Sequence, residues 1–530
     1  MSAEAIAAGL AALTEWTAAL EWDAIPEPVQ RRAALVLCDD LGAVVAARDE
    51  PELMALQDGV AKSSGRAEAT VFNARGKRMD RYSAAVANGA ASDWCELDEG
   101  YRRVICHAGI YCLPALLAEA EAEGASTRDL LRALVIGYET AARVARAFTF
   151  PNLVLHPHGS LAAVANGAAS DWCELDEGYR RVICHAGIYC LPALLAEAEA
   201  EGASTRELLR ALVIGYETSA RVARAFTFPN LVLHPHGSLA AVGAAAAVAA
   251  LRRLSPETAV GAISSADTMV LPGPYTHPIK GSLVRNVWPA MGAWTGMRAA
   301  DWAPVGIAGL PSALHDVYAD AFGATPNPQE LSEGLGESFA ISDGYHKVFA
   351  CCQYGHATIE ATKKLCRQAS PDRIANIDIE THWRARAMDN PDPPTTIGAK
   401  FSMQHIAATA AVHGEGGAEA FHASTIAMPE VAALRHKVTL APYEPEPEWP
   451  NDRPARVTWT LDDGTKLTEE VLSARGGPDL PFTPDEIRAK IHGIVSQPYP
   501  AMAPVLDRLM ALEGAALERS WAEAVVAMTA

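Results

Sequence analysis

Residues 87–242 contain one segment written twice, and this repeat constrains the fold more than any other feature of the sequence. The segment from Ala87 to Val164 returns from Ala165 to Val242, at an offset of 78 residues. The copies differ where Glu207 replaces Asp129 and Ser219 replaces Ala141. Solenoid repeats have periods of about 20–50 residues and three or more copies. Two nearly identical, longer copies indicate a recent tandem duplication, or an artefact of assembly or cloning, in a parent chain of 452 residues.

The composition is that of a globular protein with more than one domain. The chain has 530 residues, of which 50% are hydrophobic and 20% are charged, and this length exceeds what one core normally serves. The net charge of −20 argues against nucleic acid or an anionic membrane as the main partner, but not against a small anionic substrate in a basic pocket. No apolar run of about 18 residues and no signal-peptide pattern stands out, so we expect a soluble, cytoplasmic protein.

The first two thirds of the chain show helical periodicity. Amphipathic helices are predicted over residues 2–22 and from about 29 to 47. Each copy predicts a loop, two helices and a second loop. In copy one, Gly124 closes a helix that begins at 109, and a capping box at Ser126 opens a helix that runs to about 147. After copy two, an alanine-rich helix is predicted over residues 237–253.

The pattern changes after about Gly344. Strands are predicted at 374–383, 437–441, 455–461 and 466–471, with the Asp-Asp-Gly turn at 462–464 joining the last two as a hairpin. Helices return over 502–529. The sequence therefore predicts a mostly α protein with a helical domain at 1–344, an inserted α+β domain at 345–480, and C-terminal helices at 481–530.

An acidic box stands before a histidine in both copies. In copy two, Glu174, Asp176 and Glu177 precede His185. Carboxylates this close repel one another unless cations pair with them, and such a group can shift a pKa or fix the tautomer of a histidine. The alternative is a solvated acidic loop with a surface histidine.

Three further groups could carry chemistry. His234 and His236 flank a proline at a helix start, where they could bind a metal, an anion or a reacting proton. Lys280 and Arg285 follow in a Gly/Pro-rich connection that could clamp a carboxylate, and Lys347 lies at the seam between the predicted domains. Each group could equally be structural or solvated. The sequence has no P-loop, no dinucleotide fingerprint, no nucleophile elbow and no C-x-x-C pair.

In their order, these motifs resemble the MmgE/PrpD family. The resemblance rests on ANGAASDWCELDEGYRR, LHPHGSLAAVGAAAAVAALRRLS, KGSLVRNVWPAMGAWTGMRAADWAPVGI, GYHKVFACCQYGHATIEA and AKFSMQHIAA, and it covers nearly the whole chain once one copy is removed. The family includes 2-methylcitrate dehydratase, cis-aconitate decarboxylase and an iminodisuccinate epimerase. The resemblance implies a large all-helical domain built from both chain ends, a smaller α+β lid, a homodimer, and catalysis without a metal or organic cofactor.

The resemblance also implies roles for individual residues. The chain departs from the family where His-Ala-Gly replaces His-Pro-Gly and where a histidine stands near the position of a late tyrosine. The implied catalytic residues are Glu174, Asp176, His185, His234 and Lys280, with the first-copy equivalents Glu96, Asp98, His107 and His156. The implied substrate-binding residues are Arg285, Lys347 and His405.

The predicted function is a lyase that removes a proton next to a carboxylate of a small di- or tricarboxylic acid, as in 2-methylcitrate dehydratase. A decarboxylase or an epimerase of the same family is the alternative. Two rival hypotheses are an inactive product of the duplication, in which two hairpins compete for one position, and a zinc hydrolase that uses the His-Pro-His motif. We expect copy two to form the site, because its acidic loop runs unbroken into the alanine-rich helix. The alternative is a hybrid site with the acidic loop of copy one and His234 of copy two.

Overall fold

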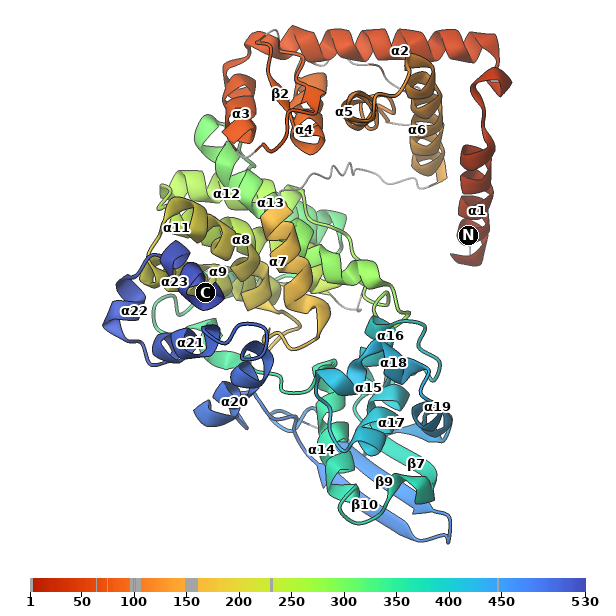
Figure 1. The fold of residues 1–530 in the computed structure, drawn as a ribbon, viewed down its shortest axis with the longest axis vertical. Coiled ribbons are helices and arrows are strands. Elements are labelled where there is room, and N and C mark those ends of the chain that lie inside the picture. Colours follow the sequence, from red (N-terminus) through yellow and green to blue (C-terminus); the bar gives the residue numbers. More distant parts are fainter. Residues whose placement is uncertain are drawn as a thin grey trace. The chain divides into compact units, whose positions relative to one another are not determined.

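The computed structural model describes residues 3–62, 64–73, 75–95, 99, 101, 106–147, 161–228, 232–445 and 448–530. The fold is mostly α-helical, which confirms the predicted class (Figure 1). It divides into two compact units: Met1–His158 with Pro304–Ile307, and Gly159–Ala303 with Ala308–Ala530. Copy one therefore belongs mainly to the first unit, and copy two lies entirely in the second.

The first unit joins the N-terminal helices to copy one. Val36 and Leu37 of its second helix pack against Leu113 and Leu134 of copy one. Ser126 caps the predicted helix as expected, because the Asp129 N–H donates to Ser126 Oγ at 3.1 Å. The elements are α1 (Ala3–Ala19), α2 (Glu27–Ala46), α3 (Pro51–Lys62), β1 (Ala69–Thr70), β2 (Arg78–Met79), α4 (Arg81–Trp94), α5 (Leu113–Glu123) and α6 (Thr127–Ala147).

The second unit is built around the alanine-rich helix α11 (Ala240–Leu251), which is buried along nearly its whole length. A Cβ on Gly215 would lie 2.6 Å from Ala247 Cβ, so glycine is required where helix α9 meets α11. Its neighbours are α8 (Ala186–Glu201), α9 (Thr205–Ala225), α10 (Pro235–Ser238), α12 (Pro256–Thr268) and α13 (Trp288–Trp302), and α7 (Leu161–Trp172) packs on α8 and α13.

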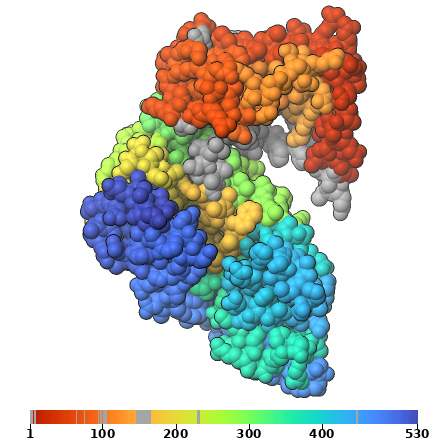
Figure 2. Space-filling model, viewed as in Figure 1, coloured from red at the N-terminus to blue at the C-terminus, as the bar shows by residue number. Residues whose placement is uncertain are grey.

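The chain ends beside copy two. Helix α23 packs against α8, and α22 packs against α9. The C-terminal residues form the blue part of the surface in Figure 2. The last four helices are α20 (Pro484–Val495), α21 (Met502–Met510), α22 (Gly514–Glu518) and α23 (Trp521–Thr529).

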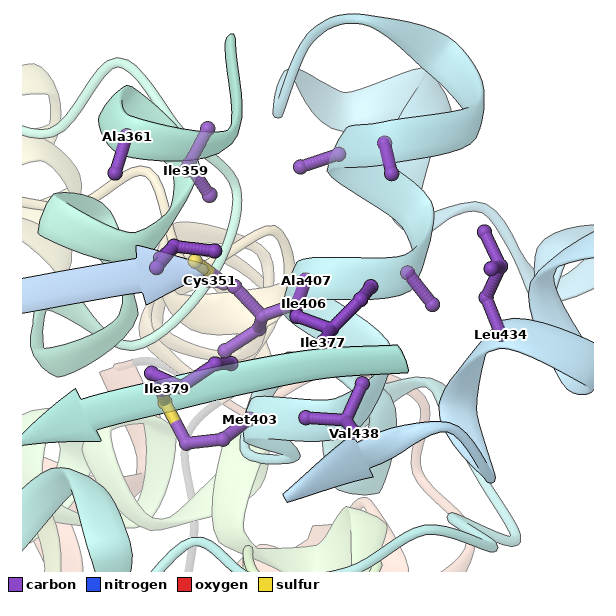
Figure 3. Packing of buried hydrophobic residues seen from close by; sticks show 14 of the residues in the cluster. Cys351, Ile359, Ala361, Ile377, Ile379, Met403, Ile406, Ala407, Leu434 and Val438 are labelled. Atoms are coloured by element: carbon purple, nitrogen blue, oxygen red, sulfur yellow. The ribbon is translucent and has the colours of Figure 1, made fainter. Parts of the chain in front are cut away.

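The predicted strands form one four-stranded sheet in the second unit. They are β7 (Ile374–Thr381), β8 (Val438–Pro442), β9 (Ala455–Leu461) and β10 (Lys466–Val471), in the order β10-β9-β7-β8. Only β7 and β8 pair in parallel. Inward residues such as Ile377 and Ile379 alternate with outward ones along β7, and they pack against Ile406 of α17 (Met403–His413) and Ile359 of α14 (His356–Leu365) (Figure 3).

Short elements complete this part of the chain: α15 (Trp383–Arg386), α16 (Thr396–Lys400), α18 (Ala423–Ile426) and α19 (Pro429–Arg435). Two-stranded pairs join β3 (Gly178–Tyr179) to β6 (Gly344–Tyr345) and β4 (Phe226–Thr227) to β5 (Thr325–Pro326). None of the described helices has both the length and the hydropathy of a membrane crossing. The division at residues 344 and 480 stays a prediction.

Candidate active site

A small cavity of about 40 Å³ lies in the second unit. Its walls come from three parts of the chain: the loop between α7 and α8 of copy two, residues 234–285, and residues 345–453. Its wall includes one carboxylate, two histidines and three cations: Glu174, His185, His234, Arg285, Lys347 and Arg453. Copy two therefore supplies the acidic box and both predicted catalytic histidines of this site.

The loop between α7 and α8 holds its carboxylates in an unusual backbone conformation. Glu174 has a φ of +54°, in the left-handed region that non-glycine residues adopt at a free-energy penalty of roughly 1–3 kcal/mol. Its N–H donates to the Asp171 carbonyl at 3.2 Å. The turn directs the Glu174 carboxylate to two cations, Arg285 and Lys347.

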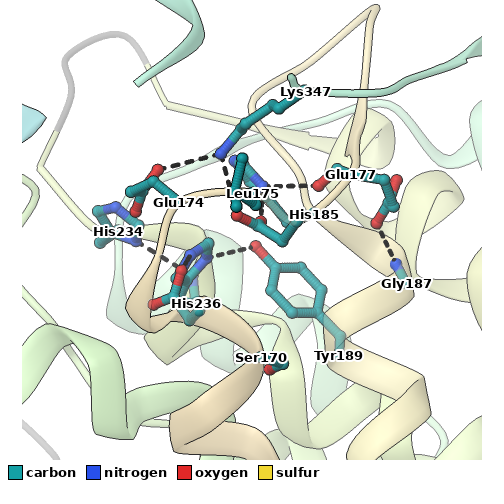
Figure 4. Close-up of polar contacts among 12 residues, drawn as sticks. Ser170, Glu174, Leu175, Glu177, His185, Gly187, Tyr189, His234, His236 and Lys347 are labelled. Atoms are coloured by element: carbon teal, nitrogen blue, oxygen red, sulfur yellow. Dashed lines mark hydrogen bonds and ion pairs between the residues drawn. The ribbon is translucent and has the colours of Figure 1, made fainter. Parts of the chain in front are cut away.

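Three buried carboxylates alternate with these two cations. Arg285 Nη1 pairs with Asp171 and Glu174, and Lys347 Nζ lies 3.0 Å from both Glu174 Oε2 and Asp176 Oδ1 (Figure 4). Burial alone would raise the pKa of Asp176, but Lys347 and His185 hold that pKa well below its usual value. Burial opposes the charge of Lys347, yet the Asp176 and Glu174 carboxylates raise its pKa. The box is thus an ion network and not a solvated loop.

His185 is oriented by its neighbours. Its Nδ1 lies 2.6 Å from Asp176 Oδ2 and 2.9 Å from the Glu177 carbonyl oxygen. Both partners are acceptors, so Nδ1 carries the proton and Nε2 is left as the basic nitrogen. Glu177 is held in turn by the Gly187 N–H at 2.6 Å and by the Tyr216 hydroxyl at 2.8 Å. A histidine fixed in this tautomer by a carboxylate is suited to proton transfer.

His234 has the opposite tautomer. Its Nδ1 accepts the His236 N–H at 3.3 Å, so the proton lies on Nε2. Burial, followed by the charges of His236 and Arg285, lowers the pKa of His234 well below its usual value and keeps the ring neutral. The cavity thus has a basic nitrogen on His185 and a neutral N–H donor on His234.

His236 is a supporting residue. The Tyr189 hydroxyl lies 3.0 Å from its Nδ1, and Asp171 Oδ1 lies 3.2 Å from its Nε2. With both ring nitrogens engaged, the His-Pro-His motif does not present two open ligand atoms, so it gives the zinc hypothesis no support. Three groups of described residues have metal-ligand spacing: Asp171 with Glu174 and Asp176, Asp176 with His185 and His236, and the exposed group of His315, Asp316 and Asp320. In the first group, however, Arg285 and Lys347 bridge the carboxylates at the positions that a cation would take.

The structure brings most of the predicted residues together but leaves two apart. Glu174, Asp176, His185 and His234 gather with Arg285 and Lys347, while Lys280 is exposed and is not part of the cavity wall. His405 is buried in α17, where its Nδ1 lies 3.2 Å from Arg435 Nη1, and it also lies outside the wall. In copy one, His107 is half-buried in the first unit. Glu96, Asp98 and His156 lie outside the described residues.

Several residues of the site are missing from the sequence-based prediction. Asp171 belongs to the network, and its only signal is its place just before the acidic box. Tyr189 is hidden in an apolar helix of the repeat. Arg453 follows a proline-rich loop far from the other motifs, so no local pattern could indicate it.

The buried histidines predict an acid-sensitive fold. Burial lowers the pKa of His234 and His236 well below 6.5, and that of His356, His382 and His405 to about 3. Below pH 6.5 the unfolded chain binds protons on these histidines and the folded chain does not, so stability falls as the pH falls. Burial acts in the opposite direction on three acids, by raising the pKa of Glu177 and Asp267 to about 7 and that of Asp171 above its usual value.

More histidines than acids are shifted in this way, so the net effect is a loss of stability as the pH falls below 6.5. We therefore expect the melting temperature, followed by circular dichroism, to drop steeply between pH 6.5 and 5. The variant His382→Gln should reduce this slope, because it removes one buried neutral histidine outside the cavity wall. A melting temperature independent of pH in this range would contradict the burial of these rings.

The chain was compared with known proteins. The sequence model of the MmgE/PrpD N-terminal domain matches residues 11–165 and again 160–326, and that of the C-terminal domain matches residues 349–506. The two N-terminal matches meet at the junction of the copies. The cis-aconitate decarboxylase-like protein oryM of Aspergillus oryzae is 29% identical over 63% of this chain and 75% of its own length. The cis-aconitate decarboxylase of Aspergillus terreus is 24% identical over 59% of this chain and 70% of its own. The predicted resemblance is confirmed, and the chain belongs to the MmgE/PrpD family.

Proposed function

We propose that this protein is a lyase that moves a proton at a carbon next to a carboxylate of a small di- or tricarboxylic acid. The observation that carries the proposal is the orientation of His185. Asp176 holds its Nδ1 at 2.6 Å, and the ring lines a cavity that Lys347 and Arg285 also line. The proposed steps use only side chains of this chain. A homodimer also remains a proposal.

Decarboxylation of a cis-aconitate-like acid is the outcome that the relatives favour, because two of them are cis-aconitate decarboxylases or resemble them. In this reaction the bond between the CH₂ group and its carboxylate breaks and CO₂ leaves. The electron pair moves through the adjacent double bond, and the carbon at its far end takes a proton. His185, protonated on Nε2 before the step and stabilised by Asp176, would deliver that proton.

Dehydration, as in 2-methylcitrate dehydratase, is the second candidate. It is favoured by the basic Nε2 of His185, which can remove a carbon-bound proton before a neighbouring hydroxyl leaves as water. In either reaction charge develops on a carboxylate oxygen of the substrate. The neutral His234 Nε2–H, with Lys347 and Arg285 nearby, would stabilise that charge. Epimerisation would follow if the proton returned to the other face of the carbon.

The site must widen to take such a substrate. A cavity of about 40 Å³ holds two or three water molecules, whereas ligand pockets usually measure about 300–1,000 Å³. The walls from residues 345–453 and from copy two therefore have to separate, or their side chains have to rearrange, before the acid enters. We propose that the α+β part serves as the lid of the site.

The test is proton exchange at carbon. The full chain would be incubated in D₂O with cis-aconitate, 2-methylcitrate and simpler dicarboxylic acids, and the acids followed by nuclear magnetic resonance. Decarboxylation and epimerisation should place deuterium on carbon, whereas dehydration should remove a carbon-bound proton and place deuterium on carbon only when it runs in reverse. Release of CO₂ or loss of a hydroxyl would then identify the reaction. A folded chain that neither converts any of these acids nor exchanges a carbon-bound proton in them would overturn the proposal.

A further inference from the structure

The cations of the cavity wall differ in how their charge is balanced. Arg285 already pairs with Asp171 and Glu174, and Lys347 pairs with Glu174 and Asp176. Their donors are thus largely committed to the protein's own carboxylates. The third cation of the wall, Arg453, has no such carboxylate at hydrogen-bond distance among the described residues.

Arg453 is buried without a full set of partners. It is 8% exposed, and its Nη1 has no hydrogen-bond partner in the described part of the chain. The nearest carboxylate is that of Asp452, 3.9 Å from Arg453 Nε. Asp452 is itself held by Arg180, whose Nη1 lies 3.1 Å from Asp452 Oδ2. A buried donor without a partner lowers stability, so its retention at a cavity wall points to a ligand.

Two tyrosine rings fix the guanidinium of Arg453. Its Cζ lies 5.5 Å from the centroid of the Tyr345 ring and 5.3 Å from that of Tyr354. Cation–π contacts of this kind hold the guanidinium in place without using its N–H donors. A guanidinium held in this way can donate two parallel hydrogen bonds to a carboxylate.

Tyr345 links this arginine to the reacting centre. The centroid of its ring lies 6.2 Å from that of His185, so the same tyrosine contacts both Arg453 and the proposed proton carrier. A molecule bound in the cavity can therefore reach both groups at once. A bound acid would place one carboxylate at Arg453 and its reacting carbon at His185, with the Tyr345 ring between these two positions.

We propose that Arg453 anchors the substrate carboxylate that lies farthest from the carbon that meets His185, which in cis-aconitate is the carboxylate of the CH₂ group. The proposal rests on the proposed function and extends it, because it makes the protein selective for acids with an additional carboxylate. Arg285 and Lys347 set the charge around the reacting carbon, and Arg453 binds the carboxylate at the other end of the molecule. Acids that lack this carboxylate lose the contribution of Arg453 to their binding.

The test compares two acids of the same core. Cis-aconitate is maleate with a carboxymethyl substituent, and citraconate carries a methyl group at that place, so the two differ by one carboxylate. Binding would be measured by calorimetry on the full chain carrying His185→Asn, which slows turnover, with and without Arg453→Gln. Loss of one charge-assisted contact should weaken cis-aconitate binding about 10- to 100-fold and change citraconate binding less than twofold.

Controls separate anchoring from structure. Arg456→Gln alters an arginine three residues further along the chain, in β9, where it pairs with Glu380 and Glu470 outside the cavity wall. It should leave both affinities unchanged. Arg453→Lys keeps the charge but loses the two-pronged geometry, and should recover only part of the affinity for cis-aconitate. Equal losses for both acids, or no loss for either, would overturn the anchor. If the His185→Asn chain with Arg453 intact binds neither acid, the proposed function fails instead.

Discussion

Replacing His185 by asparagine is expected to lower kcat by about 10²–10⁴-fold, the usual contribution of a general acid–base residue. The same replacement at His107 is expected to leave kcat unchanged. The two histidines occupy equivalent positions in the repeat, so the pair is a matched control for the chemistry of the substitution. Only His185 lines the cavity with Lys347 and His234.

The measurement is steady-state turnover of whichever acid exchanges a proton in D₂O. KM should change less than kcat in His185→Asn, because His185 acts on the reacting carbon and the cations hold the substrate. Melting temperatures of both variants show whether either substitution disturbs folding. A chain in which His107→Asn abolishes turnover and His185→Asn does not would place the active site in copy one.

The sequence is sufficient to predict the sheet and most of the helices. Alternating apolar residues and the turn at 462–464 predicted β9 and β10 at their observed bounds, because strand periodicity and turn chemistry are local properties. Gly464 has the positive φ of +83° that such a turn requires. The glycine of α9 that meets α11 has no such local signal, because the contact joins distant segments.

The site was only partly predictable, for a geometric reason. Lys280 and Arg285 lie five residues apart in one Gly/Pro-rich connection, and their order does not show which side chain points inward. A short 3₁₀ helix at Leu283–Val287 buries Arg285 against Asp171, while Lys280 stays at the surface. Periodicity cannot anticipate the direction of a side chain in an irregular segment.

The two copies show how far an identical sequence determines its own structure. Glu99 accepts the Gly109 N–H in copy one as Glu177 accepts the Gly187 N–H in copy two. The helix of copy two nevertheless begins at Ala186, whereas that of copy one begins only at Leu113. In copy two the first turn of α8 buries Tyr189, and the Tyr189 hydroxyl forms a hydrogen bond with His236, which lies outside α8 and α9. Local contacts thus repeat, and helix length depends on the surroundings.

One helix face is exposed in copy two, whereas the equivalent face in copy one is buried. Asn88 of α4 is fully buried, accepts the Phe72 N–H at 3.0 Å and donates to the Thr70 carbonyl at 2.9 Å. Its equivalent on α7, Asn166, is exposed. Ala91 and its equivalent Ala169 differ in the same way. The face of α4 that the N-terminal segment covers is therefore present a second time, on α7.

Deleting residues 87–164 should let that segment cover α7. The deletion joins Val86 to Ala165, so the N-terminal helices enter copy two in the same order in which they now enter copy one. It also removes exposed apolar side chains such as Val144, which is 47% exposed, whereas its equivalent Val222 is 2% exposed. We expect a folded chain of 452 residues whose kcat stays within about threefold of the full chain, since every cavity residue is retained. Its melting temperature should rise by about 1 °C for each kcal/mol gained.

The repeat supplies the control for this deletion as well. Removing residues 165–242 instead leaves a chain that differs from the first only in carrying Asp129 and Ala141 in place of Glu207 and Ser219. Ser219 Oγ donates to the Gly215 carbonyl at 2.9 Å, so the second deletion should be less stable by about 1 kcal/mol and equally active. Loss of turnover in both deletions, with folding intact, would show that the duplicated segment is needed for the reaction. Full activity in both would show that one copy is sufficient, because the acidic box, the two histidines and the cations belong to a single set.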